Sequence, residues 1–328
     1  MQSLSIHNYK SLVNFELRNI NPFTVFVGAN GVGKSNFFEA LEYLNYKYLM
    51  DWLQVDELFG GEGNFVNQNM DNQEMLNIKL EISGNFMLSI DKVLKGQVRI
   101  EKVKEGQIEY ADHFLEVKLQ QQQFIHSFSR IFINAKEGNK INTASSSKKL
   151  NFNGDNLEYV LQRLLSQNKA DEIIDWLSLV RPGFKNIKIE QGISNKPVLQ
   201  LFEEGYEKAF GKNLISDGTY NILCILTAIY QTDEPQFLCI EEPENGLNPY
   251  VLTELVKFIR AICSEKGHYI WLNTHSQTIV NNLLPEEIII LNKEEGITKP
   301  KQVEQKDLHG LPLDEAWLTN VLGGGIPW

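Results

Sequence analysis

The pattern of apolar and polar positions predicts short strands at the start of the chain. Residues 2–20 alternate apolar and polar side chains, which indicates two strands joined by a turn at 8–11. The next segment, 23–27, is a continuous run of β-branched and aromatic residues and predicts a buried strand. From residue 36 the apolar positions recur at helical spacing, so we expect a helix that ends near residue 53.

A region of different amino-acid composition follows this helix. The stretch 59–73 is rich in glycine, asparagine and glutamine and is expected to be an exposed loop. Several strand-like runs with turn signals between them then predict an antiparallel meander, at 76–83, 86–91, 98–103 and 114–119. Another strand is expected at 129–134, and a loop rich in glycine, asparagine, serine and lysine at 136–152.

The second half of the chain alternates helical and strand-like segments. Helices are expected at 157–165, 173–177, 220–230 and 249–263. Strands are expected between and after them, at 187–190, 198–202, 237–241, 268–272 and 287–291. This pattern predicts an α/β fold, without an internal repeat and without a heptad run long enough for a coiled-coil arm.

Composition and charge narrow the class of protein. The 328 residues carry a net charge of −11, so the bulk charge does not indicate a nucleic acid or an anionic membrane as partner. No apolar run approaches the ~20 residues needed to span a bilayer, and the N-terminus lacks a signal-peptide core. The three cysteines show no metal or redox spacing and are expected to be buried thiols. We therefore expect a cytoplasmic protein that does not enter a membrane.

One stretch carries a specific chemical signal. Residues Gly28–Ser35 fit the phosphate-loop pattern G-x-x-x-x-G-K-[ST] at every fixed position, between a predicted strand and a predicted helix. The glycines let backbone N–H groups approach phosphate oxygens, and the helix N-terminus adds partial positive charge. Lys34 would reach the β- and γ-phosphates, and Ser35 would ligate Mg²⁺. The other residues expected to bind nucleotide here are Asn30, Gly31, Gly33 and Asn36.

Two acids follow a hydrophobic strand later in the chain. The run 237–241 delivers Glu241 and Glu242 at its carboxyl end, which is where phosphate-loop enzymes hold Mg²⁺ opposite the loop. Glu241 would hold the metal through water, and Glu242 could orient and deprotonate the attacking water. Two surface acids before a proline are the alternative interpretation.

Two further features complete the candidate chemistry. Ser216, Gly218 and Thr219 open a predicted helix and could form a second phosphate site, although such residues more often only cap a helix. His275 directly follows an apolar strand and could contact a γ-phosphate and position water, although a lone histidine is more often structural.

The order and spacing of these features resemble a known family. Ser216 precedes Glu242 by 26 residues, and His275 follows it by 33. The chain resembles an ABC-type ATPase head of the SMC/RecF/OLD branch, and more closely the stand-alone bacterial AAA-family ATPases. These share the Asn-Gly-x-Gly-Lys-Ser loop and the Glu-Glu-Pro-Glu-Asn-Gly-Leu motif, here at 241–247. The segments 6–12 and 322–328 also resemble this group. The resemblance covers residues 60–150 least.

The resemblance implies a single head over 1–328 that dimerises around two ATP molecules with Mg²⁺. It implies an antiparallel β lobe at 1–150, a helical signature subdomain at 151–222, and a lobe at 223–328 with the paired acids and histidine. In this family Ser216–Thr219 matches the signature motif, which contacts the γ-phosphate held by the partner head. Lys10 lies where relatives carry a basic residue near the nucleotide.

Some positions depart from the family pattern. Asp217 stands where transporters usually have glycine, Glu241 replaces the more common aspartate, and Asn248 stands where close relatives often carry histidine. The glutamine that completes Mg²⁺ coordination is not identified; Gln68 and Gln73 are candidates.

Three functions remain open at this point. The first is an ATP-driven switch, as a homodimer or with a related head, that controls an effector or nuclease partner in anti-phage defence. The segment after His275 is short, so we expect no built-in nuclease domain. The second is a RecF-like, DNA-binding repair ATPase. A small-molecule P-loop kinase ranks last, because such enzymes lack the signature and histidine, and a transporter subunit fits these motif forms less well.

Overall fold

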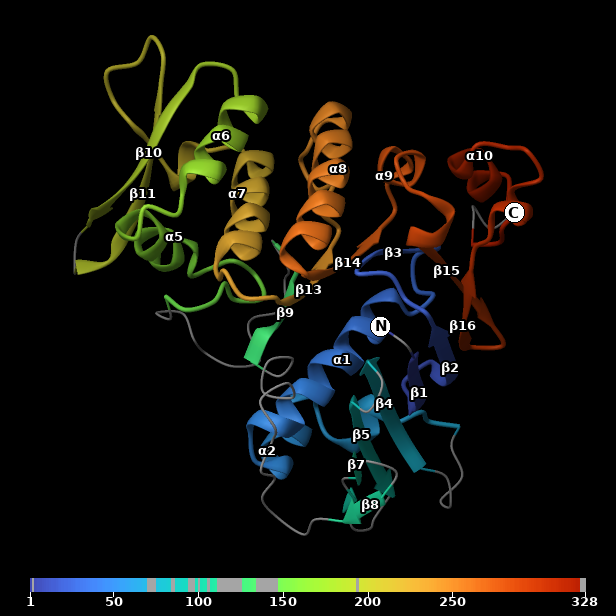
Figure 1. Ribbon diagram of the computed structural model, residues 1–328. Helices are drawn as coiled ribbons and strands as arrows, with labels where there is room; N and C mark the ends of the chain where they lie inside the picture. The colour runs from blue at the N-terminus through green and yellow to red at the C-terminus, as the bar shows by residue number, and fades with distance from the viewer. Residues whose placement is uncertain are drawn as a thin grey trace.

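A six-stranded sheet runs through the centre of the computed structural model (Figure 1). The structure describes residues 1, 3–69, 75–83, 86–93, 98–99, 101–104, 107–110, 126–133, 147–192 and 195–324. The strand order is β16–β15–β3–β14–β13–β9, and all neighbours are parallel except β16, which pairs antiparallel with β15. In that order the strands span Ile297–Gln302, Ile288–Glu294, Phe23–Val27, Tyr269–Thr274, Phe237–Glu241 and Phe128–Ile131.

The strands of this sheet send alternate side chains into two separate apolar cores. In β3, Val25 and Val27 join the core on one face, whereas Phe26 joins the core on the other. In β14, Leu272 joins the same core as Val25, and Trp271 joins the same core as Phe26. Successive side chains of a strand point to opposite faces, and both faces are covered here. This is why these strands read as continuous apolar runs in the sequence.

Helices cover one face of the sheet, above it in Figure 1. They are α5 (Leu157–Ser166), α6 (Asp171–Val180), α7 (Asp217–Tyr230), α8 (Pro249–Lys266), α9 (Gln277–Asn281) and α10 (Leu313–Leu318). Next to α5 and α6 lies a three-stranded sheet of β10 (Phe184–Gln191), β11 (Pro197–Glu203) and β12 (Phe210–Gly211). Short 3₁₀ turns η2, η3 and η4 occupy Lys212–Leu214, Pro285–Glu287 and Gln305–Leu308.

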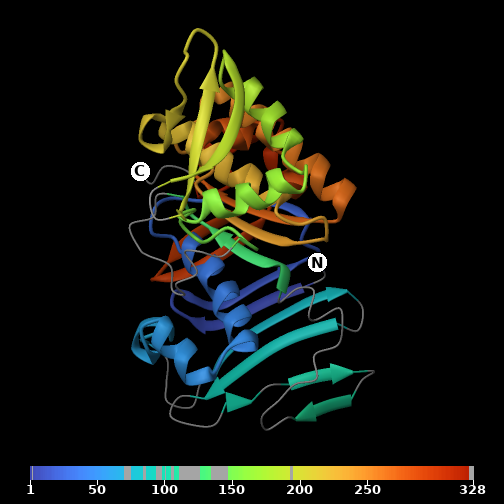
Figure 2. The ribbon, with the colours of Figure 1, turned by 90° about the vertical axis from the view of Figure 1, so that its left-hand side faces the viewer.

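The other face carries α1 (Lys34–Leu49) and an antiparallel sheet, as Figure 2 shows from the side. The order of this sheet is β2–β1–β4–β5–β6, with strands at Leu12–Arg18, Ser3–Tyr9, Met75–Ser83, Phe86–Val93 and Val98–Arg99. A separate hairpin joins β7 (Glu101–Lys104) to β8 (Gln107–Tyr110). The predicted antiparallel meander is confirmed over these strands, whereas its expected strand at 114–119 lies outside the described residues.

This arrangement confirms the predicted α/β class, with the predicted antiparallel β lobe beside the central sheet. The central sheet takes β3 and β9 from the expected lobe at 1–150 and its other strands from the expected lobe at 223–328. Helix α7 runs through the expected boundary between 222 and 223. The lobe boundaries themselves remain predictions. None of the helices in the described ranges is long and apolar enough to cross a membrane.

Two expectations about the first half are wrong. The helix after the loop ends at Leu49 rather than near 53, because Asp51 caps a new helix, α2 (Trp52–Leu58), by accepting hydrogen bonds from the Leu53 and Gln54 amides. The stretch 59–73 is not simply an exposed loop. It contains α3 (Glu62–Phe65), and Phe65 is fully buried against the first hairpin. Strand β16 and helices α9 and α10 were not predicted.

Candidate nucleotide site

The loop between β3 and α1 has a backbone that only glycine fits at two positions. Gly28 has φ 155°, and a β-carbon there would lie 2.3 Å from the carbonyl oxygen of Leu291. Gly33 has φ 105°, and a β-carbon would lie 2.3 Å from the Thr298 hydroxyl oxygen. Positive φ and close neighbours together exclude a side chain at both positions. The sequence pattern of the loop is therefore required by its packing against β15 and β16.

The N-terminus of α1 is suited to an anion. Gly33 is its N-cap residue, no side chain caps it, and its first turn contains no acidic residue. The first N–H groups of a helix lack partners within the helix and carry partial positive charge. Phosphate oxygens would satisfy these N–H groups, as they do at other phosphate loops.

Lys34, the first residue of α1, is folded back onto the loop. Its ammonium group donates hydrogen bonds to the carbonyl oxygens of Gly28, at 2.8 Å, and Ala29, at 3.0 Å, and lies 3.5 Å from Nδ1 of His275. Burial lowers the pKa of Lys34 to about 8, although Glu242 and the neighbouring acids Glu244 and Glu241 partly offset this effect. A nearby dianionic phosphate would favour the charged form and raise this pKa again.

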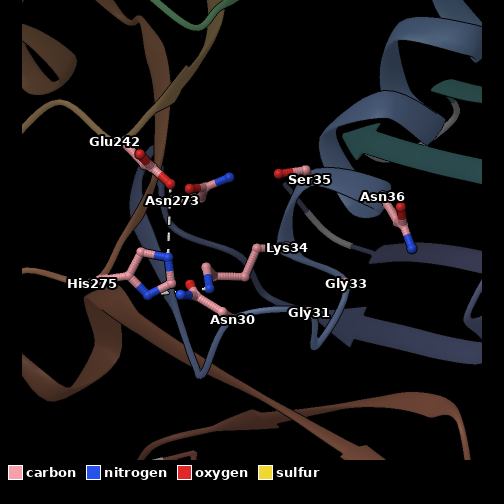
Figure 3. A pocket seen from close by; sticks show the side chains of 9 residues that line it. All are labelled: Asn30, Gly31, Gly33, Lys34, Ser35, Asn36, Glu242, Asn273 and His275. Carbon is pink, nitrogen blue, oxygen red and sulfur yellow. Dashed lines mark hydrogen bonds and ion pairs between the residues drawn. The ribbon is translucent and has the colours of Figure 1, made fainter. Parts of the chain in front are cut away.

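A cavity of about 190 Å³ opens in front of this loop (Figure 3). Eight of the residues that line it are residues that the sequence singled out, namely Asn30, Gly31, Gly33, Lys34, Ser35, Asn36, Glu242 and His275. The ninth is Asn273, at the carboxyl end of β14. The structure thus brings together two segments more than 200 residues apart in the sequence.

Glu242 faces the cavity from the end of β13. Its φ of 47° is left-handed, which is uncommon for a residue with a long side chain, and its amide donates to the carbonyl oxygen of Asn273. The side-chain amide of Asn245 donates to Oε2 of the Glu242 carboxylate at 3.2 Å. Strain of this kind is often found at functional sites, where the surrounding structure holds it in place. The backbone here aims Glu242 at the loop rather than along the strand.

His275 lies between Glu242 and Lys34 (Figure 3). Its Nε2 atom is 3.8 Å from a carboxylate oxygen of Glu242, and its backbone amide donates to Glu244 at 2.8 Å. Burial and the Lys34 charge lower the pKa of His275, although Glu242 and Glu244 oppose this shift. A neutral imidazole beside a carboxylate can accept or donate a hydrogen bond to water or phosphate.

Glu241 lies behind the cavity rather than on its wall. It is 3% exposed and accepts hydrogen bonds from the Ser35 hydroxyl, at 2.6 Å, and the Asn273 amide, at 2.9 Å. A hydroxyl and a carboxylate are the hard oxygen donors that Mg²⁺ prefers. Within the described part of the chain, no three His, Cys, Asp or Glu side chains form a metal cage. The residues fit a Mg²⁺ that takes most of its ligands from phosphates and water.

The predicted signature residues lie elsewhere. Ser216 caps α7, with its hydroxyl accepting from the Thr219 amide at 3.3 Å, and Arg181 donates to the Thr219 hydroxyl. Neither these residues nor Gly218 lines the cavity. A phosphate bound at this helix end would accept the hydrogen bond that the Thr219 amide now donates to Ser216. It would lie close to the exposed Asp217 carboxylate.

Lys10 and Gln68 also lie outside the cavity lining. Lys10 forms an ion pair with Glu39 on α1, at 2.5 Å. Gln68 is exposed, and Gln73 lies outside the described residues. No glutamine is therefore assigned to Mg²⁺ coordination.

Sequence reasoning missed two residues that contact Glu241. Asn273 was visible only as a polar residue at the end of an apolar strand, one of several such positions. Arg130, which pairs with Glu241, stands alone as a charge within the apolar strand β9. A single charge in a buried strand usually has a buried partner, and this signal could have pointed to Arg130.

The comparison with known families decides what this chain is related to. The profile of one family, described as "AAA domain, putative AbiEii toxin, Type IV TA system", matches residues 81–281, more than half of the chain. The chain belongs to this family. The matched range includes Ser216–Thr219, both acids and His275, whereas the loop at 28–35 precedes it. No curated protein matches the sequence.

Solved structures show the fold of this AAA-domain protein. One is the SMC head bound to the C-winged helix domain of ScpA, with a TM-score of 0.64 at 12% identity over 93% of this chain and 98% of that one. Another is a Pyrococcus furiosus Smc head domain with an extended coiled coil, bound to the C-terminal domain of ScpA. It has a TM-score of 0.59 at 12% identity, over 94% of this chain and 97% of that one. The AAA-domain protein therefore has the fold of an SMC-type ATPase head.

Proposed function

We propose that this AAA-domain protein binds and hydrolyses ATP as one half of a two-headed assembly that switches a partner protein. One observation carries the proposal. The phosphate loop, Glu242 and His275 surround a single cavity, whereas the helix end at Ser216–Thr219 lies outside it. A head with a complete loop and a separate signature, exposed at Ser216 and Asp217, would be completed by a second head.

Four side chains of the cavity have a role in this proposal. Lys34 binds the β- and γ-phosphates, and the N–H groups at the start of α1 bind the remaining oxygens. Ser35 holds Mg²⁺ with support from Glu241, and the ion when bound neutralises charge on the phosphates. Glu242 accepts the proton of the attacking water, and His275 orients that water and the γ-phosphate.

The size of the cavity supports a shared site. Its volume of about 190 Å³ is below the ~300–1,000 Å³ typical of complete small-molecule sites, so it accommodates the phosphate end of a nucleotide better than the whole. We infer that Ser216, Gly218 and Thr219 of a second copy, or of a related head, cover the remaining side. Two copies related by a two-fold axis would form two such sites.

The partner protein is proposed on the basis of the comparisons. The solved SMC head binds the C-winged helix domain of ScpA, so a head with this fold can bind another protein. The family description names a toxin of a toxin–antitoxin system. We propose that the ATP-dependent closing of two heads controls an effector, such as a nuclease, in a toxin-type or anti-phage system.

Mixing two inactive variants tests the shared site. Lys34→Ala removes the loop lysine, and Ser216→Asp keeps an N-cap acceptor but places a negative charge where the γ-phosphate would approach. We expect each variant alone to lack ATP hydrolysis. A mixture should recover part of it, because a mixed dimer has one site with an intact loop and an intact signature.

The control is a chain that carries both substitutions, mixed with the Ser216→Asp chain. This mixture has no intact site and should stay inactive. Full hydrolysis by the Ser216→Asp protein alone, or no recovery on mixing two folded single variants, would contradict the two-headed proposal. Absence of ATP binding by the unmodified protein would contradict the function as a whole.

A further inference from the structure

Arg130 is buried directly behind the cavity, at the edge of the central sheet. It lies on β9, the strand next to β13, and its side chain is 7% exposed. Its Nε atom donates to Oε1 of Glu241 at 2.6 Å, and a terminal nitrogen lies 2.5 Å from the same oxygen in an ion pair. The planar guanidinium also lies over the ring of Phe152, 4.9 Å from its centroid. Its orientation is therefore held from two sides.

The hydrogen bonds of Glu241 use the whole carboxylate. An ionised carboxylate has about four lone-pair positions on its two oxygens. Arg130 donates from Nε to Oε1 and forms an ion pair with the same oxygen, whereas the Ser35 hydroxyl and the Asn273 amide donate to Oε2. Protein groups thus contact both oxygens of this carboxylate. The carboxylate is positioned as an acceptor for the Ser35 hydroxyl, because Arg130 holds one of its oxygens and Asn273 also holds the other.

A second acid on α1 fixes the other end of the guanidinium. Glu42 accepts from Arg130 at 2.9 Å, and its side chain is 7% exposed. Burial by itself lowers the pKa of Arg130, but Glu241 and Glu42 outweigh it and raise this pKa, so Arg130 stays charged. Arg130 therefore joins α1, which carries Ser35, to β13, which carries Glu241, through one buried cation.

We propose that Arg130 is a positioning residue for the Mg²⁺ site, acting by holding Glu241 as the acceptor of the Ser35 hydroxyl. This inference rests on the proposed function, because it requires that Ser35 ligates Mg²⁺. A hydroxyl that donates its proton to Glu241 presents its lone pairs to the metal. Glu241 then acts on the metal through Ser35, and Arg130 acts through Glu241.

The geometry of the guanidinium, not only its charge, carries this role. A lysine at position 130 would keep the positive charge but would replace the contacts of three guanidinium nitrogens with a point charge. Glu241 could then rotate, and Oε2 would leave the Ser35 hydroxyl. The Lys variant keeps the buried carboxylates compensated, so it is expected to fold even where a neutral residue at position 130 does not.

The test measures metal binding separately from nucleotide binding. Mn²⁺ replaces Mg²⁺, and electron paramagnetic resonance reports the free ion in the presence of a non-hydrolysable ATP analogue. For Arg130→Lys and Arg130→Met we expect Mn²⁺ affinity to fall by about 10–100-fold, the usual effect of removing a group that orients a metal ligand. Binding of the analogue in EDTA should change by less than about twofold, because Lys34 and the α1 N-terminus are intact.

Arg260→Met is the matched control. Arg260 forms a similar partly buried pair with Glu287 that includes contacts at 2.6 and 2.7 Å, on α8 and away from the cavity lining. This variant should leave Mn²⁺ affinity unchanged. Folded Arg130 variants with unchanged or increased Mn²⁺ affinity would overturn the inference. If Ser35→Ala also leaves Mn²⁺ affinity unchanged, the proposed metal site fails first, which separates the two proposals.

Discussion

A β-carbon on Gly218 would lie 2.0 Å from the carbonyl oxygen of Gly246, so the first turn of α7 meets the segment after Glu242 backbone against backbone. Asn221, one turn further along α7, donates to the carbonyl oxygens of Pro243, at 3.0 Å, and Asn245, at 2.8 Å. The predicted signature and the predicted catalytic acid are therefore rigidly joined within one head. A shift of α7 on closing against another head would move the backbone that carries Glu242.

Gly218→Ala should damage this contact. The added methyl group would collide with the Gly246 carbonyl, and overpacking of this kind costs about 1–3 kcal/mol. We expect the free energy of unfolding, measured in urea, to fall by that amount, and ATP hydrolysis to fall with it.

Gly211→Ala provides the comparison for Gly218→Ala. A β-carbon on Gly211 would have open space around it, and its φ of −77° suits any residue. This change should be neutral or stabilising by up to about 1 kcal/mol. Equal stability of the two variants would show that the Gly218 contact is not tight.

Asn221→Leu should loosen the segment 243–247. The side chain of Asn221 is 2% exposed, and its loss leaves two carbonyl oxygens without their donor, at a cost of about 1–3 kcal/mol. We expect a lower unfolding free energy, and slower ATP hydrolysis with nucleotide affinity nearly unchanged. Thr227→Val on the same helix is the control, because the buried Thr227 hydroxyl has no hydrogen-bond partner. That change should be neutral or stabilising, and an equal loss in both variants would contradict the anchoring role of Asn221.

Glu242→Gln should stop hydrolysis but keep ATP bound. The amide keeps the shape of the side chain and cannot accept the proton of water, so the rate should fall by about 10²–10⁴-fold. With ATP and Mg²⁺ the variant should accumulate as a dimer, measured by size-exclusion chromatography with light scattering. Glu286→Gln, at an exposed position, should behave as the unmodified protein. A Glu242→Gln protein that stays monomeric at all concentrations with ATP would count against the two-headed assembly.

Nucleotide binding should weaken at alkaline pH. Burial lowers the pKa of Lys34 to about 8 without nucleotide, whereas bound phosphate favours the charged ammonium and raises that pKa. Binding then takes up a proton above pH 8, so affinity should be constant below about pH 7 and fall up to tenfold per pH unit above about pH 8. Titrations with a fluorescent ATP analogue measure this. A Lys34→Arg protein, whose charge does not titrate in this range, should bind with a flat profile; a flat profile for the unmodified protein would contradict this role of Lys34.

The sequence alone determined those features whose cause is local. Glycine spacing and the Lys-Ser pair define the loop, because each acts through its own backbone or side chain. Apolar runs predicted β3, β13 and β14, because a strand covered on both faces must be apolar throughout. Local signals failed at 59–73, where polar residues surround the buried Phe65, and at Asp51, whose capping interrupts an otherwise helical pattern.

Only the tertiary structure decided which residues meet behind the cavity. Arg130 and Glu241 are 111 residues apart, and Ser35 and Glu241 are 206 apart. Their contact depends on the strand order β3–β14–β13–β9 and its parallel register, which long crossovers establish and no local pattern encodes. The loop at 28–35 was evident from its own residues. That Arg130 and Asn273 hold its acid partner in place follows from the neighbours that the sheet gives to β13.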